Sequence, residues 1–361
     1  MRKYLLILGV CTIQMAYGQE PAGYYNAANN LNGQLLRAAL FNIIKGHTEQ
    51  TYGALWTAFG TTDRKTNGKV WDIYSDVPGG TPPYEYTFGS NQCSGSFSNE
   101  GDCYNREHSW PRSYFNEQAP MNTDLFHIYP TDGVVNGKRD NDPYGLVDTT
   151  ILFWQSENGS RSGVNRYPGY SGRVFEPLDS FKGDLARTYF YMSTRYYSQD
   201  GGWANWAMAN GADLKQWTID MLLEWHHKDP VSAKEIARNN AVYALQHNRN
   251  PFIDHPEYAD CIWGTATCGT PVSIATVDAS GKIRFYPNPA SDKVIVDLSL
   301  VGISEKTTID LVNVQGQPLY HKELGAKEQT TTISLHTYAK GIYWIKLSSA
   351  TTVGYKKLVI R

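Results

Sequence analysis

The chain changes character near residue 270, and this change constrains the fold more than any other feature. Residues 19 to about 270 are rich in Tyr, Trp, Asn and Gly, with long polar loops between a few helical stretches. From residue 283 onward, short runs of alternating apolar residues follow one another, separated by turn residues. Alternation of this kind is typical of half-buried strands, whereas apolar residues three and four apart are typical of helices. The sequence therefore predicts two domains, 19–269 and 283–361, joined by a linker over 270–282.

The first eighteen residues have the organisation of an export signal. Two basic residues precede a mostly apolar core over 4–15, which is followed by the small-residue cleavage site Ala16-Tyr17-Gly18. The apolar stretch is too short to span a membrane as a helix. We therefore expect 1–18 to be a signal peptide and the mature chain to be exported, beginning near Gln19.

Four cysteines remain after the signal: Cys93, Cys103, Cys261 and Cys268. An even count in an exported chain favours two disulfides. Four cysteines allow three sets of pairs, of which the two local bridges, Cys93–Cys103 and Cys261–Cys268, are the simplest. Each short loop would add roughly 2–3 kcal/mol of stability on the chain-entropy estimate. A metal site is the alternative, although no pair has the Cys-x2-Cys spacing of zinc ligands.

Helical patterns occur in three parts of the first domain. Residues 34–45 carry apolar side chains three and four positions apart, and 183–197 has a broad aromatic face. The stretch 214–247 has the same periodicity with a break at an Asp-Pro pair, after which Ser232 and Glu235 resemble a capping box. The first domain is therefore expected to be mainly helical.

The second domain contains six candidate strands of alternating pattern. They are IRFYPNP, KVIVDLS, TTIDLVNV, TTTISL, GIYWIKLSS and GYKKLVI. Short alternating strands separated by regular turns predict an antiparallel β-sandwich of about 80 residues.

This block resembles the type IX secretion sorting domain of certain Gram-negative bacteria. The matching residues are Phe285–Ser291, Gly341–Trp344 and Lys357–Ile360 near the end of the chain. The resemblance covers essentially all of 283–361. It implies an immunoglobulin-like sandwich that outer-membrane secretion machinery recognises. An ordinary sandwich that binds carbohydrate or protein is the alternative.

The pair Glu107-His108, in NREHSWPRSYF, carries the clearest chemistry of the first domain. A histidine can take a proton from water near neutral pH, and a carboxylate can hold a hard divalent cation such as magnesium. Successive side chains of a regular strand point to opposite faces. The pair can therefore serve one site only if the backbone bends, or if metal and water lie on different sides of the substrate.

The stretch 124–139, DLFHIYPTDGVVNGKR, adds candidate partners for this pair. Asn136 offers an amide oxygen as a second metal ligand, and Lys138 and Arg139 offer positive charge for a phosphate. A glutamate and an asparagine would leave most of the coordination shell to water and substrate, as magnesium sites usually do. The two stretches together indicate a metal-assisted hydrolase.

Together these stretches resemble the endonuclease I family of exported bacterial nucleases, which carry the ββα-metal motif. The resemblance runs from about residue 34 to 264, with further matches in the same order. They are Val70–Ser75, Phe175–Leu178, Phe181–Arg187, Tyr191–Met192 with Arg195–Tyr196, and Gln246–Glu257. The resemblance implies an α+β fold and metal-dependent, largely sequence-independent cleavage of DNA, often RNA too, leaving 5′-phosphate ends.

Carried over by position, the resemblance implies that His108 is the general base and that Glu107 and Asn136 hold Mg²⁺, or Ca²⁺ or Mn²⁺ in its place. The metal would stabilise charge on the phosphate and on the departing 3′ oxygen. Some relatives carry a phosphate-binding arginine in an insertion after the histidine, but the short segment that follows here holds only Arg112. We therefore expect Arg139 or Arg112 to take this role.

Three further arginines, Arg161, Arg166 and Arg173, fall in one expected loop with interleaved aromatic residues. Positive charge combined with stacking suits a strand-binding groove, so these arginines and Lys138 are candidates for substrate binding. A solvated loop is the alternative. Residues 19–281 hold 20 basic and 29 acidic residues, which disfavours broad adhesion to nucleic acid and requires a local basic cleft.

We therefore expect a secreted or cell-surface monomer that cleaves DNA, often RNA too, and that secretion machinery recognises through its second domain. One rival is a metallo-hydrolase of another phosphodiester, which activity on small diesters alone would mark. The other rival is a non-catalytic surface adhesin that binds glycan or DNA, which metal-independent binding without cleavage would mark.

Overall fold

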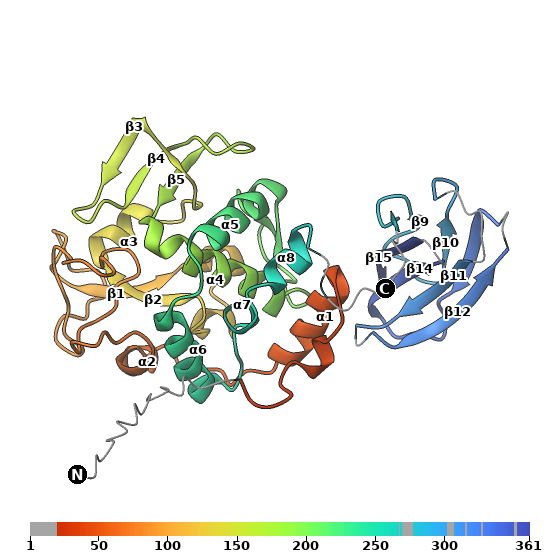
Figure 1. Ribbon diagram of the computed structural model, residues 1–361, viewed down its shortest axis with the longest axis horizontal. Helices are drawn as coiled ribbons and strands as arrows, with labels where there is room; N and C mark the ends of the chain where they lie inside the picture. Colours follow the sequence, from red (N-terminus) through yellow and green to blue (C-terminus); the bar gives the residue numbers. More distant parts are fainter. Residues whose placement is uncertain are drawn as a thin grey trace, which may run out of the picture.

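The computed structural model describes residues 20–266, 268, 277–301, 307–314, 316–325, 328–349 and 352–361. The expected signal peptide and residues 270–276 of the expected linker lie outside these ranges. The first domain is mainly helical with small sheets, and the second is all-β (Figure 1). The predicted α+β architecture is confirmed. Within the described ranges, no helix combines the length and the apolar character needed to cross a membrane.

The helices of the first domain pack around one core of aromatic and aliphatic side chains. They are α1 (Gly33–Ile44), α2 (Leu55–Thr62), α3 (Gly133–Arg139), α4 (Lys182–Arg195), α5 (Gln216–Lys228), α6 (Ala233–Gln246), α7 (Pro251–Asp254) and α8 (Tyr258–Trp263). Short 3-10 helices occur at Asn26–Ala28, Arg112–Phe115, Met121–Thr123 and Asp179–Phe181. The three predicted helical stretches are confirmed as α1, α4 and the pair α5–α6. Ser232 and Glu235 form the predicted capping box at the start of α6.

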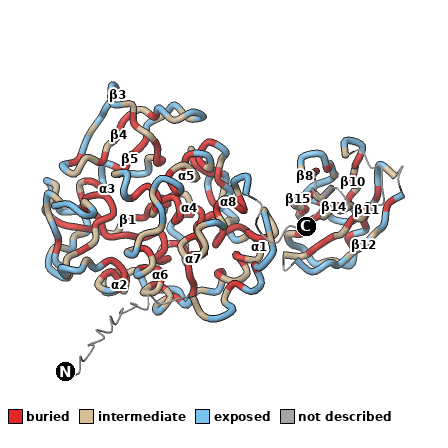
Figure 2. Tube along the Cα trace, in the orientation of Figure 1, coloured by how far each residue is buried: buried red, intermediate tan, exposed pale blue. Residues whose placement is uncertain are grey.

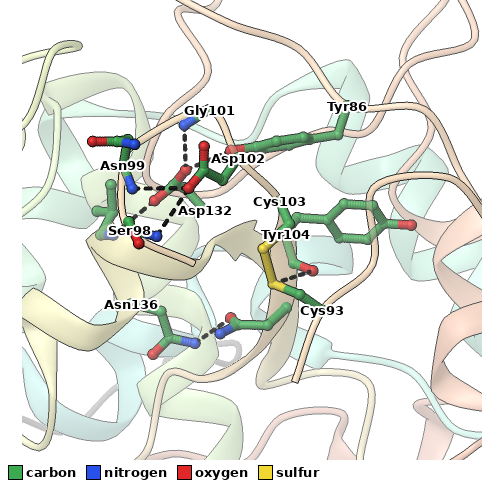
Figure 3. The surroundings of a disulfide bond; sticks show 12 residues. Tyr86, Cys93, Ser98, Asn99, Gly101, Asp102, Cys103, Tyr104, Asp132 and Asn136 are labelled. Carbon is green, nitrogen blue, oxygen red and sulfur yellow. Dashed lines mark hydrogen bonds between the residues drawn. A yellow bond between two sulfur atoms is a disulfide. The ribbon is translucent and has the colours of Figure 1, made fainter. Parts of the chain in front are cut away.

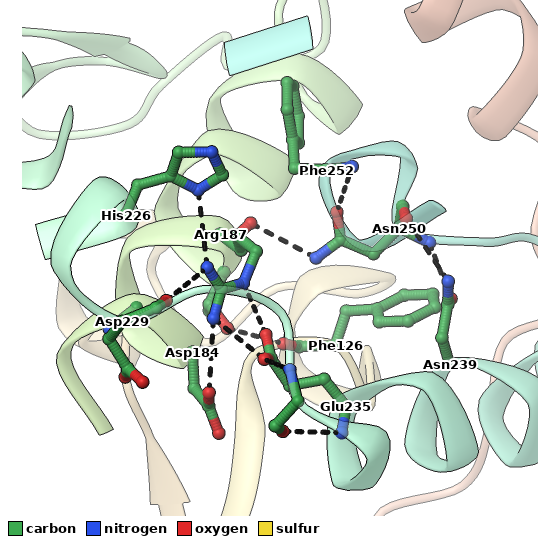
Figure 4. Close-up of polar contacts among 12 residues, drawn as sticks. Phe126, Asp184, Arg187, His226, Asp229, Glu235, Asn239, Asn250 and Phe252 are labelled. Atoms are coloured by element: carbon green, nitrogen blue, oxygen red, sulfur yellow. Dashed lines mark hydrogen bonds and ion pairs between the residues drawn. The ribbon is translucent and has the colours of Figure 1, made fainter. Parts of the chain in front are cut away.

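Helix α4 runs through the middle of the first domain and is buried along nearly its whole length (Figure 2). Its buried cation, Arg187, donates to the Glu235 carboxylate through Nη2 at 2.8 Å and to the Asp229 carbonyl through Nη1 at 2.8 Å (Figure 4). Burial and the neighbouring Glu235 carboxylate raise the pKa of Asp184 well above its usual range. This network joins α4 to the connection between α5 and α6.

Three small sheets complete the first domain. Strands β1 (Tyr104–His108) and β2 (Ile128–Asp132) pair antiparallel, β3 (Val147–Gln155), β4 (Arg161–Asn165) and β5 (Arg173–Glu176) form a sheet in that order, and β6 (Ala209–Asn210) pairs with β7 (Asp213–Leu214). Strand β2 runs directly into α3, so β1, β2 and α3 form a ββα unit. The sheet of β3, β4 and β5, here called the wing, projects from one side of the domain (Figure 1).

The structure of the wing shows that one prediction, a single loop carrying three arginines, is wrong. The stretch that carries Arg161, Arg166 and Arg173 is not one loop, because Arg161 begins β4, Arg173 begins β5, and only Arg166 lies in the connection between them. The glycines and serines of this stretch suggested a loop. The backbone instead pairs Arg161 with Glu176 and Val164 with Arg173 across the two strands.

The second domain is a sandwich of two sheets over an aliphatic core. One sheet has the order β13-β10-β9 and the other the order β12-β11-β14-β15-β8. The strands are β8 (Val277–Asp278), β9 (Arg284–Tyr286), β10 (Lys293–Asp297), β11 (Thr307–Val312), β12 (Pro318–Leu324), β13 (Thr330–Ser334), β14 (Gly341–Ser348) and β15 (Thr352–Ile360). All six predicted runs contain strands, and the immunoglobulin-like sandwich is confirmed.

Two strands of the sandwich were not predicted. Strand β8 pairs in parallel with β15 and Ala279 lies in the sandwich core, so 277–282 belongs to this domain rather than to the expected linker. Strand β12, with the sequence PLYHKEL, lies at a sheet edge and is largely exposed. A strand with so little burial needs no apolar face, so its sequence carries no clear alternation.

Candidate active site

The ββα unit borders a cavity of about 650 Å³. Side chains from the two motif stretches meet in its lining, together with Tyr52 from a more distant segment. Those with candidate chemistry are Tyr52, Asn105, Arg106, Glu107, His108, Arg112, Asn136 and Arg139. The cavity therefore brings together the predicted base, both predicted metal ligands and both arginines predicted for the phosphate.

Strand β1 presents its two faces to two sides of this cavity. Residues 105 and 107 share one face, and residues 106 and 108 share the other. On the first face, the Asn105 amide oxygen accepts a hydrogen bond from Asn136 Nδ2 of α3 at 2.6 Å. On the second face, the His108 ring is stacked with the Tyr52 ring at 6.1 Å between centroids. Glu107 and His108 thus serve one cavity from opposite faces of a regular strand, without a bend between them.

The carboxylate of Glu107 is buried and held from within the protein. Its Oε1 accepts hydrogen bonds from Tyr74 Oη at 2.7 Å and from Arg139 Nη1 at 2.9 Å. Burial raises the pKa of Glu107, while Arg139 and the Tyr74 hydrogen bond oppose that shift. Two donors on one oxygen fix the orientation of the carboxylate at the cavity wall.

The imidazole of His108 has a defined tautomer. Its Nε2 lies 3.2 Å from the backbone carbonyl oxygen of Asn122. A carbonyl only accepts hydrogen bonds, so Nε2 carries the proton and Nδ1 carries the lone pair. Burial, together with the neighbouring His127, lowers the pKa of His108 well below its usual range. The side chain is therefore neutral near pH 7 and has the lone pair that a general base needs.

The corner between β2 and α3 is held by two buried aspartates. Asp132 caps α3, because its Oδ1 accepts a hydrogen bond from Val135 N at 2.9 Å. Asp72 in turn accepts hydrogen bonds from Thr131 Oγ1 at 2.6 Å and from Asp132 N at 2.7 Å. Burial raises the pKa of Asp72 to about 7. These bonds fix the start of α3 and thereby place Asn136, one turn further on, in the cavity lining.

The local disulfide pairing is confirmed, and one bridge borders the cavity. Cys93 is bonded to Cys103 at 2.03 Å, next to β1 (Figure 3), and Cys261 is bonded to Cys268. The enclosed loop also contacts the ββα unit, since Gly101 N donates to Asp132 Oδ2 at 2.8 Å. The Cys93–Cys103 bridge therefore fixes to β1 the segment in which Cys93 and its neighbours line the cavity.

The phosphate role predicted for Arg139 does not fit its position. The side chain is only 1% exposed. Its Nη1 donates to Glu107 and to the His108 carbonyl at 3.0 Å, and its Nη2 donates to the Ser109 carbonyl. Both terminal nitrogens are thus used inside the protein. Arg139 holds Glu107 and the end of β1 in place.

The family model described as Endonuclease I matches residues 32–257 of the chain. The chain belongs to the endonuclease I family. A second model, described as a secretion system C-terminal sorting domain, matches residues 284–361. The endonuclease I domain is thus followed by a sorting domain, and the protein is secreted or carried on the cell surface. Both predicted resemblances are confirmed.

Relatives of the endonuclease I domain include proteins named for both kinds of nucleic acid. The extracellular ribonucleases of Bacillus amyloliquefaciens and Bacillus subtilis are 38% and 36% identical, and each match covers 66% of this chain and 78% of the relative. A periplasmic deoxyribonuclease of Aeromonas hydrophila is 27% identical, covering 37% of this chain and 48% of the relative. These matches support a nuclease that is exported.

The remaining basic residues predicted for the endonuclease I site lie outside the cavity or at its rim. Arg112 lines the cavity, is exposed, and contacts Glu117 at 3.4 Å. The other four, Lys138, Arg161, Arg166 and Arg173, are not in its lining. Arg173 pairs with Asp142 at 2.6 Å and donates to the Lys138 carbonyl at 3.2 Å, so the wing adjoins the end of α3.

Sequence reasoning missed several residues that support or line the site. Tyr74 and Asp72 lie in the stretch 70–75, which carried part of the family resemblance but had no assigned role. Tyr52 and Arg106 carried no sequence signal of their own, because their importance depends on a stack formed between distant segments.

The donor set of the cavity fits a hard divalent cation. In the part of the chain that the structure describes, no cluster of three or more His, Cys, Asp or Glu side chains could hold a metal. Glu107 and Asn136 instead offer one carboxylate and one amide, both at the cavity wall. Oxygen ligands that leave most of the shell to water and substrate match the preference of magnesium.

Proposed function

We propose that the endonuclease I domain is a metal-dependent, largely sequence-nonspecific endonuclease that hydrolyses phosphodiester bonds to leave 5′-phosphate ends. The observation that carries this proposal is the cavity itself. It places a neutral histidine with a lone pair on one face of β1 and a fixed carboxylate with an asparagine on the other. A phosphodiester between these faces would meet a base on one side and oxygen ligands for a cation on the other.

In the proposed reaction, His108 Nδ1 takes a proton from a water molecule whose oxygen attacks phosphorus. The phosphorus–O3′ bond breaks, and the departing oxygen takes up a proton from solvent. Glu107 and Asn136 would hold a divalent cation, either Mg²⁺ or, in its place, Ca²⁺ or Mn²⁺. This cation would supply Lewis-acid stabilisation of the charge on the phosphate and on the leaving group. Arg139 and Tyr74 keep the Glu107 carboxylate oriented throughout.

Substrate contacts beyond the cavity are proposed for the exposed rim and the wing. Arg112 is exposed at the cavity and can reach a phosphate once it leaves Glu117. Lys138, Arg161, Arg166 and Arg173 would contact the backbone of a strand that continues past the end of α3. The wing also exposes Phe153, which lies 5.7 Å from the Arg173 guanidinium and can stack on a base.

We propose DNA as substrate, as the family resemblance implies, and RNA as a second substrate, because relatives are named for both nucleic acids. We propose that the protein acts as a monomer outside the cell and that its sorting domain contacts the secretion machinery. The adhesin alternative is not favoured by the family match or by the chemistry of the cavity.

The test uses the mature full-length chain with both disulfides formed. Supercoiled plasmid and single-stranded RNA are incubated with wild type and with His108→Ala, in magnesium and in chelator. Magnesium-dependent cleavage that falls about 10²- to 10⁴-fold in the variant is expected for loss of a general base. Equal cleavage by both proteins would exclude His108 as the base, and no cleavage by folded wild type would reject the nuclease proposal.

A further inference from the structure

A third arginine lines the cavity besides Arg112 and Arg139, and no role was predicted for it. Arg106 precedes Glu107 on β1 and shares the strand face of His108. Its guanidinium carbon lies 3.7 Å from the centroid of the Tyr52 ring and 4.4 Å from that of the Trp56 ring. The two rings hold the plane of the guanidinium at the cavity wall.

The hydrogen-bonding capacity of Arg106 is only partly used. Its Nη1 donates to the Tyr52 carbonyl at 2.8 Å, while its buried Nε has no partner in the described part of the chain. No carboxylate among the described residues forms an ion pair with it. Arg112, Arg139 and Arg173, in contrast, each pair with a carboxylate. A half-buried cation without a counter-charge is stabilised when an anion enters the cavity.

We infer that Arg106 binds a phosphate of the substrate strand on the His108 side of the cavity. This inference rests on the proposed function and identifies the residue that replaces Arg139 in the phosphate role. A planar guanidinium can donate two parallel hydrogen bonds to two phosphate oxygens, which a lysine cannot do. Stacking on two rings fixes the donor before substrate arrives and so reduces the entropy lost on binding.

The alternative is that Arg106 only joins the segment 52–56 to β1. Arg64, an exposed arginine outside the cavity, is the control for a stacked arginine with a purely structural role. It also stacks on an aromatic ring, with its guanidinium carbon 5.0 Å from the Phe88 centroid, and its Nε donates to the Gly60 carbonyl at 2.8 Å. It does not line the cavity.

The experiment compares wild type, Arg106→Gln, Arg106→Lys and Arg64→Gln as mature full-length proteins. Three quantities are measured: kcat/KM on a DNA oligonucleotide in magnesium, the salt dependence of oligonucleotide binding in chelator, and the Tm. We expect Arg106→Gln to lower kcat/KM about 10- to 100-fold and to reduce the slope of log Kd against log salt by about 1. Arg64→Gln should match wild type in kcat/KM and in slope.

Arg106→Lys keeps the charge but loses the two parallel donors, so we expect its kcat/KM to fall about tenfold with little change in Tm. If Arg106→Gln is too unstable to assay, the kcat/KM of Arg106→Lys tests the phosphate contact instead. Wild-type kcat/KM and slope in a folded Arg106 variant would overturn the inference while leaving the nuclease proposal intact. If wild type does not cleave, the nuclease proposal fails, and the salt slope still tests the phosphate contact.

Discussion

The ββα unit and strand β3 of the wing are neighbouring structures that differ in how far their residues are buried. All five residues of β2 are buried, and the polar groups at its corner bond to one another. Strand β3 of the wing is exposed over most of its length, and Ile151, Leu152 and Phe153 are 47%, 42% and 54% exposed. Figure 2 shows this contrast in burial between the two units.

This difference in burial suggests that the ββα unit carries out catalysis and that the exposed part of the wing contacts other molecules. In the ββα unit, removal of one polar partner leaves another unpaired in a dry environment, which costs stability and disturbs the site. At the exposed positions of the wing, in β3 and at Arg173, the same change exposes groups that water already solvates, so the fold is little affected. Substitutions should therefore change stability and turnover in the ββα unit, and only binding at the exposed positions of the wing.

The largest contrast is expected between two ion pairs of similar distance. Arg139 pairs with Glu107 at 2.9 Å in a buried setting, and Arg173 pairs with Asp142 at 2.6 Å with its side chain 48% exposed. Arg139→Met leaves a buried carboxylate unpaired and should lower the free energy of unfolding by about 3–5 kcal/mol. Arg173→Met should lower it by about 1 kcal/mol or less. Urea unfolding measures the free energy of unfolding of both variants. Equal decreases in the two variants would contradict the expected difference between the buried and the exposed ion pair.

A smaller effect is expected at Tyr74, whose hydroxyl holds Glu107. Tyr74→Phe deletes this hydroxyl without changing the ring, and should lower the free energy of unfolding by about 1–3 kcal/mol. We also expect kcat to fall, because the carboxylate loses one of the two donors on Oε1. Tyr170→Phe, at a partly buried tyrosine that stacks on Trp217 outside the cavity lining, is the control. A Tyr74 variant with wild-type stability and kcat would show that Arg139 alone positions the carboxylate.

The pH dependence of kcat/KM tests the burial of His108. Burial lowers its pKa, so the base stays neutral below pH 6.5 and activity is lost only as pH falls through that lowered value. A histidine with an ordinary pKa would lose activity about tenfold by pH 5.5. We expect a smaller loss, measured with metal kept saturating at each pH. A bound cation next to His108 would shift the pKa in the same direction. A full tenfold loss would contradict the neutral, buried base.

The smallest effect on the fold is expected in the wing. Phe153→Ser removes an exposed ring and should change the free energy of unfolding by less than about 0.5 kcal/mol. If the wing contacts the substrate strand, KM for a long single strand should rise a few-fold while kcat is unchanged, and a short oligonucleotide should show no difference. A fall in kcat would show that Phe153 affects the catalytic step and would contradict a role in binding alone.

Periodicity and motif order predicted much of this molecule. The helices α1, α5 and α6 and most sandwich strands bury one apolar face, and this burial imposes the spacing from which they were predicted. Helix α4 was predicted from its broad aromatic face, although it is buried on nearly all sides. The Glu107-His108 pair and Asn136 were found because a metal-assisted hydrolase needs these groups, and the fold brings them to one cavity.

The remainder depends on contacts between distant segments. Arg139 follows Asn136 by three positions and carries the charge that a phosphate requires, but its side chain turns inward to Glu107. Arg106 becomes a candidate only because Tyr52 and Trp56 stack on it from another segment. The pairing of β4 with β5 was missed because glycine and serine are typical of turns, so these residues predicted a loop instead of strands.

We propose that the two faces of β1 have separate roles, with the cation held on the Glu107 face and proton transfer on the His108 face. Calorimetric titration of Mn²⁺ into wild type, Glu107→Gln and His108→Ala, beside plasmid cleavage by each, tests it directly. We expect cleavage to be lost in both variants, but Mn²⁺ affinity to fall at least about tenfold only in Glu107→Gln. Wild-type Mn²⁺ affinity in Glu107→Gln, or an equal loss in His108→Ala, would contradict this division.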